Sequence, residues 1–248
     1  PVGSINAFSS KKSSLITYYY KKISVANGNF KVNLKGDKTI LLSSLNFHSS
    51  NINGRYVSLV EIEEGQASGF SNHEVKFENL IFDEVDQYLQ VNKVGINPLD
   101  DSLKNKIYAD VSNILISNFD PIKTSSDSLL DFGSVEIDSV NLFGNWHLNP
   151  PEKQKKQEVI FGKLDLRKLN ANCKLGDNQF QLNNATLTAN DFHSNKDHVL
   201  VDNDITFFSG SVNIKTKTFT TFLDSVLLTS NNRSVSTKSG KIAISQDS

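Results

Sequence analysis

The chain has no methionine, and its 248 residues include only one cysteine, one tryptophan and five prolines. A single thiol, Cys173, excludes an intrachain disulfide and a cysteine-based metal cluster within one chain. Because the sequence starts at Pro1, we expect a processed protein or a segment of a longer one. No apolar run approaches the ~20 residues of a membrane-spanning helix. We therefore expect membrane contact only through segments outside this sequence.

Neither sign of charge dominates the composition. The chain has 26 Lys and Arg against 27 Asp and Glu, a formal net charge of −1. Nucleic-acid-binding domains concentrate basic residues on one face or in one stripe, and here the basic residues are dispersed among acidic ones. We therefore expect no nucleic-acid partner.

Apolar residues alternate with polar ones along nearly the whole sequence. Phe30, Val32 and Leu34 alternate before the turn pair Gly36-Asp37, and the alternation resumes at Ile40. A period of two is typical of strands with one buried face, and short turns between such runs favour antiparallel pairing. The sequence therefore predicts an all-β protein of long antiparallel strands.

One stretch departs from this alternation. Leu99, Leu103, Ile107 and Val111 recur at intervals of four after Pro98, a residue tolerated in the first turn of a helix. We expect at most one short helix, near residues 98–110.

A more detailed pattern recurs through the chain: two alternating apolar residues, a polar two-residue step, and two more alternating apolar residues. A regular strand would send the second pair to the opposite face. One extra residue, in a β-bulge or bend, would keep all four on one face. The candidate lining of such a face is Ile40, Leu42, Leu45, Phe47, Val75, Phe77, Leu80, Phe82, Val135, Ile137, Val140, Leu142, Leu164, Leu166, Leu169, Phe180, Leu182 and Leu187.

The pattern thus predicts long strands, each bent near its middle, in a curved sheet or groove. A β-sandwich whose strands turn corners between two sheets is the main alternative. A parallel β-helix is a further, lower-ranked alternative, because its rungs should recur at a fixed period and the copies of the pattern are irregularly spaced.

The predicted organisation is one elongated β domain over residues 23–248, after a loosely ordered segment at 1–22. The stretches 121–131, rich in Ser and Asp, and 149–158, with two prolines and three lysines, are typical of loops. Either could mark a subdivision of the domain.

Several segments resemble the repeats of AsmA-like and TamB-like proteins of Gram-negative envelopes. They are residues 23–32 (ISVANGNFKV), 161–172 (FGKLDLRKLNAN) and 178–189 (NQFQLNNATLTA), with further copies at 134–143 and 222–228. The resemblance implies a periplasmic β-groove with an apolar interior, anchored to the membrane in the full-length protein. It also implies a role in lipid movement or outer-membrane homeostasis.

The sequence carries no recognisable catalytic motif. His193 and His198 do not have the spacing of a zinc pair, and Asp83 and Asp100 belong to acidic runs typical of turns. We expect no catalysis, no cofactor and no metal. The expected partner is a lipid or another apolar ligand, together with envelope proteins. A structural or adhesive surface module that binds protein or carbohydrate is the alternative.

Overall fold

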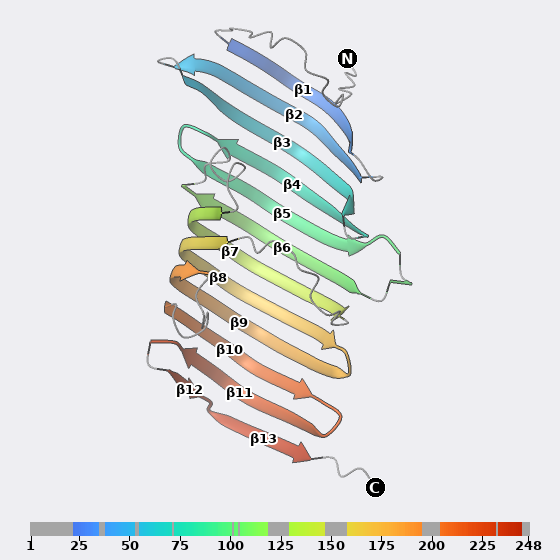
Figure 1. Cartoon of the computed structure of the whole chain (residues 1–248), viewed down its shortest axis with the longest axis vertical. Helices are drawn as coiled ribbons and strands as arrows, with labels where there is room; N and C mark the ends of the chain where they lie inside the picture. Colours follow the sequence, from blue (N-terminus) through green and yellow to red (C-terminus); the bar gives the residue numbers. More distant parts are fainter. Residues whose placement is uncertain are drawn as a thin grey trace.

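The protein is a single open, curved sheet of thirteen strands (Figure 1). The computed structural model describes residues 22–34, 38–52, 55–70, 72–100, 102–103, 105–118, 129–146, 158–194, 204–231 and 233–244. The strands are β1 (Lys22–Leu34), β2 (Lys38–Ile52), β3 (Arg55–Phe70), β4 (His73–Asp83), β5 (Tyr88–Pro98), β6 (Lys106–Ser117), β7 (Leu129–Trp146), β8 (Glu158–Leu175), β9 (Asn178–His193), β10 (Asp204–Lys215), β11 (Phe219–Thr229), β12 (Ser234–Ser236) and β13 (Ser239–Ile244).

The strands lie side by side in sequence order, and both β12 and β13 pair with β11. Every pair is antiparallel except β7 and β8, which are parallel. The prediction of antiparallel pairing is therefore wrong at this one place. The two strands are joined by residues 147–157, which lie outside the described residues, whereas the antiparallel pairs β8 and β9 are joined by the tight turn at Gly176-Asp177. A parallel pair cannot be joined by a tight hairpin, but a long connection does not by itself set the direction, since residues 118–128 join the antiparallel pair β6–β7.

Within the described residues the sheet is one layer, because extensive contacts are made only between strands that are neighbours in the sheet. The all-β class and the curved sheet of bent strands are confirmed. The sandwich and the β-helix are not what the chain forms, since there is no second sheet and no rung-like repetition among the described strands.

The predicted helix near residues 98–110 is wrong. Residues up to Pro98 belong to β5, and residues from Lys106 belong to β6. The apolar residues spaced by four, from Leu99 to Val111, span both a turn and the start of β6. Within β6, Ile107 and Val111 follow the ordinary alternation of a strand. No described helix is long and apolar enough to cross a membrane.

Some predicted boundaries fall on residues that the structure does not describe. Residues 1–21 lie outside the described residues, as do 121–128 and 149–157. The remaining residues of the two predicted loops, 129–131 and Glu158, begin strands β7 and β8.

A line of irregular residues crosses the sheet near the middle of the strands, and we call it the crease. At the crease each of the strands β2 to β11 has a residue that is left out of the pairing with its neighbours, as with Glu63 between the pairs Ser43–Glu64 and Leu45–Ile62. The skipped residues of the other strands include Ser44, Asn79, Asn92, Asn113, Asp138, Asn184, Gly210 and Ser225.

Backbone dihedrals explain how the strands bend. Ser44, Asn79, Asn113, Asn184 and Ser225 all have φ between 49° and 55°, in the left-handed region. They lie on β2, β4, β6, β9 and β11. These five strands run in the same direction, because the parallel pair β7–β8 shifts the alternation of strand direction by one. Asn is among the residues that tolerate this conformation best, and short polar side chains at a kink can meet water. The predicted polar steps therefore coincide with the bends.

The conformation of the crease generates a prediction. Asn79 has φ 51°, whereas Asn92, skipped at the same level of neighbouring β5, is not among the residues with positive φ. We expect Asn79→Val to lower the free energy of unfolding by roughly 1–3 kcal/mol, since a β-branched residue is strained in the left-handed region. Urea unfolding measures the effect. Asn92→Val is the matched control and should be neutral or slightly stabilising; equal losses in both variants would contradict the assignment.

Candidate functional site

Apolar residues, with Ser209 as the one polar exception, line up across the sheet in four rows, formed by residues that pair strand to strand. Row A is Leu45, Ile62, Leu80, Val91, Ile114, Ile137, Leu166, Leu187, Phe207 and Leu228. Row B is Val25, Phe47, Val60, Phe82, Leu89, Ile116, Val135, Leu164, Ala189 and Ile205.

Rows C and D lie on the far side of row A from row B. Row C is Phe30, Leu42, Gly65, Phe77, Val94, Val111, Val140, Leu169, Ala185, Ser209 and Val226; row D is Val32, Ile40, Ala67, Val75, Ile96, Ala109, Leu142, Ala171, Leu182, Val212 and Leu223. The crease runs between rows A and C up to β8. It runs between rows C and D from β9 on, after the register shifts of the β8–β9 ladder.

The four rows share one side of the sheet, which we call the apolar face. Along β11 the row residues are buried or half-buried on both sides of the crease, whereas Phe222 and Leu227, each next to a row residue, are exposed. This burial pattern is expected if the extra residue Ser225 places Val226 and Leu228 on the same face as Leu223.

Every row member is buried or half-buried, although no described layer covers either face. All ten of the buried apolar residues among the described ones belong to the rows, and they include Ile62, Val91 and Leu166. A single layer buries side chains on its concave side, because there the side chains of neighbouring strands converge. We therefore assign the apolar face to the concave side of the sheet.

The structure brings the predicted lining residues together. Each of them lies in one of the four rows except Phe180, which continues the face beside Cys173 and Ile214. The candidate lining omitted the row residues of β1, β3, β5, β6, β10 and β11. The signal was present in β5, where Leu89, Val91, Val94 and Ile96 repeat the spacing around Asn92-Lys93.

A second bend, also unpredicted, lies beyond row B in β7, β8 and β9. Gly133, Gly162 and Asp191 are skipped in the pairing there, and Asp191 has φ 50°. Immediately past it, the rings of Phe132 and Phe161 stack with centroids 5.6 Å apart, and Phe192 lies 5.5 Å from Phe161. The sequence signal is a Phe-Gly pair in each of two neighbouring strands.

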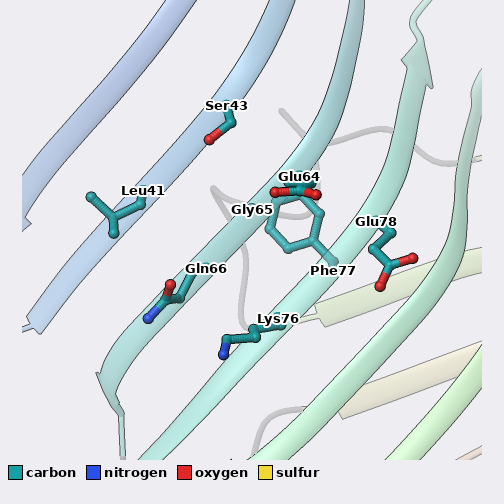
Figure 2. A pocket seen from close by; sticks show the side chains of 8 residues that line it. All are labelled: Leu41, Ser43, Glu64, Gly65, Gln66, Lys76, Phe77 and Glu78. Atoms are coloured by element: carbon teal, nitrogen blue, oxygen red, sulfur yellow. The ribbon is translucent and has the colours of Figure 1, made fainter.

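Row C contains a close fit between a glycine and a ring. A Cβ atom built on Gly65 would lie 1.9 Å from the Phe77 ring, so the ring occupies the space that a side chain would fill. Figure 2 shows Gly65 and Phe77 among the polar side chains of Glu64, Gln66 and Lys76. By alternation these polar neighbours project from the opposite face, where Lys76 pairs with Glu74 at 2.9 Å.

The acidic and thiol groups considered from the sequence have local roles. Asp83 Oδ1 accepts hydrogen bonds from the backbone N–H groups of Val85 and Asp86, and Asp100 accepts two from Ser102. All of these hydrogen bonds form turns. The two from Ser102 also lower the pKa of the Asp100 carboxyl. Burial raises the pKa of the Cys173 thiol, which disfavours the thiolate.

The histidine cluster is only partly within the described residues. His193 ends β9, while Asp197 and His198 lie outside them. Among the described residues no three His, Cys, Asp or Glu side chains are placed to hold a metal ion.

Comparison with family models, with curated proteins and with solved structures finds no match for this chain.

The fit of Phe77 over Gly65 generates a prediction. We expect Gly65→Ala to displace the ring and lower the free energy of unfolding by roughly 1–3 kcal/mol, as overpacking does. Gly95→Ala is the matched control, since its Cβ would have no neighbour closer than 3.9 Å. The control should be neutral or stabilising by about 0.5–1 kcal/mol. Thermal or urea unfolding of both variants checks the difference, and a harmless Gly65→Ala would contradict the packing.

Proposed function

We propose that the chain is a non-catalytic section of a lipid-binding or lipid-conducting surface, and that its apolar face is the binding site. The observation that supports this most directly is row A, which stays apolar across ten neighbouring strands with no polar residue. A packed core would need a covering layer, and the described residues supply none.

The dimensions suit an elongated apolar ligand. Ten strands spaced ~4.8 Å apart extend a row over about 43 Å, and the four rows, which are two, three and two residues apart, cover about 23 Å along the strands. An apolar surface of that size exceeds the few hundred Å² that monomeric proteins ordinarily leave open. Acyl chains lying along the rows would remove this surface from water at a gain of about 25 cal/mol per Å².

The compartment and the physiological role rest on the sequence resemblance. A periplasmic, membrane-anchored protein of the Gram-negative envelope that moves lipid or maintains the outer membrane would use such a face. A polar two-residue step at the crease would allow the sheet to curve around the ligand without interrupting the apolar rows.

A matched pair of variants tests the proposal. Phe207 pairs with Leu228 on the apolar face, and the adjacent pair of Phe208 with Leu227 has the same residue types on the opposite face. We expect Phe207→Gln with Leu228→Gln to weaken binding of a dansyl-labelled fatty acid about tenfold, because two apolar contacts are lost. Glutamine is neutral, so charge repulsion does not contribute. Fluorescence titration measures the affinity.

Phe208→Gln with Leu227→Gln is the control and should bind like the original chain. The proposal would be refuted by an original chain that does not bind the probe. Equal weakening by the two double variants would refute the assigned face.

A further inference from the structure

The face opposite the apolar rows carries a line of amide and aromatic side chains that the proposed lipid surface does not use. Asn172, Gln181 and Asn213 are paired in register across β8, β9 and β10. Phe143 of β7 continues the line on one side, and Phe222 of β11 continues it on the other. We call these five residues the amide row.

The two rings of the amide row are unusually open for their size. Phe143 is 47% exposed and Phe222 is 44% exposed. Each lies on the face that faces away from the apolar rows, so curvature does not bury it. An exposed aromatic ring presents a flat apolar surface, which packs against flat apolar faces of ligands.

One amide of the row lacks a hydrogen-bond partner. Asn213 Oδ1 is buried, and no described residue donates a hydrogen bond to it. A buried acceptor without a donor is costly and is rare in folded proteins. A rotation of the side chain that brought Oδ1 to the surface would let an external donor satisfy it.

A small hollow lies beside the Asn213 side chain. It is lined by Gln179, Gln181, Asn213, Lys215 and Thr220, from three neighbouring strands. Gln179 Nε2 donates to Asn172 Oδ1 at 3.0 Å, which orients the amides at one side of the hollow. Beyond it, Lys217 Nζ lies 2.6 Å from Asp177 Oδ2 and ties the β10–β11 turn to the β8–β9 turn.

We propose that the amide row is a binding site for a neutral oligosaccharide. Amide groups offer both donors and acceptors to sugar hydroxyls, and the Asn213 side chain, once rotated into the hollow, offers its unpartnered Oδ1 to one of these hydroxyls. The rings of Phe143 and Phe222 stack on the C–H faces of sugar units at the two ends. The two aromatic residues are separated by four strand spacings, about 19 Å, which suits a ligand of several sugar units.

A polypeptide fits this surface less well than a sugar does. An extended peptide binds by adding its backbone to a free sheet edge, whereas the amide row crosses strands in the middle of the sheet. The proposal concerns the face opposite the apolar rows, so it does not rest on the proposed lipid function.

Titration calorimetry of the whole chain with maltohexaose, cellohexaose, chitohexaose and mannohexaose tests the proposal. We expect saturable binding of at least one of them, weakened tenfold or more by Phe222→Ala and by Asn213→Leu. Phe208→Ala is the control, because Phe208 is an exposed ring on the same face outside the row. It should leave the affinity unchanged.

A second measurement separates binding from folding. Asn213→Leu removes the unpartnered acceptor while keeping a similar volume, so it should raise the urea midpoint of the free protein while weakening sugar binding tenfold or more. Failure of all four oligosaccharides to bind would overturn the proposal. Binding of reduced casein through Phe222 in place of sugar would also overturn it.

Discussion

The structure depends on one constraint, the strict alternation of side chains along a β-strand. A strand that carries apolar residues on both halves of its length can keep them on one face of a bent sheet only by adding a residue at the bend. In this chain every long strand adds that residue at the same level, and five of the added residues adopt a left-handed conformation. The added residues fall in line because the strands are neighbours in sequence order.

The sequence predicts this constraint well where the pattern is complete. The polar steps Ser43-Ser44, Glu78-Asn79, Asn183-Asn184 and Asp224-Ser225 each contain the residue with positive φ. Such steps are legible because a bend exposed to water requires polar residues that tolerate the left-handed region. Prediction is weaker where small residues replace large ones. In β3 the pattern reads Val60, Ile62, Gly65 and Ala67, and the glycine is explained only by the Phe77 ring of the next strand.

Other features depend on contacts that local periodicity does not encode. The spacing of Leu99, Leu103 and Ile107 indicated a helix, yet cross-strand pairing of Ile107 and Ala109 with β7 places them in a strand. The parallel pairing of β7 and β8 is not readable from the connection length, because connections of similar length join the antiparallel pairs β6–β7 and β9–β10. The Phe132–Phe161–Phe192 stack likewise requires register between three strands. Asn213 is recognisable as unusual only once its surroundings are known.

The central claim is that the halves of each strand on the two sides of the crease contribute to one apolar face. Cross-linking with a fatty acid that carries a diazirine along its chain, mapped by mass spectrometry, tests this claim most directly. We expect labelled residues in both row A and row C of strands β2 to β8, where the crease separates these rows, for example at Leu80 and Phe77. Labelling confined to one side of the crease, or concentrated on Phe208 and Leu227 of the opposite face, would contradict it.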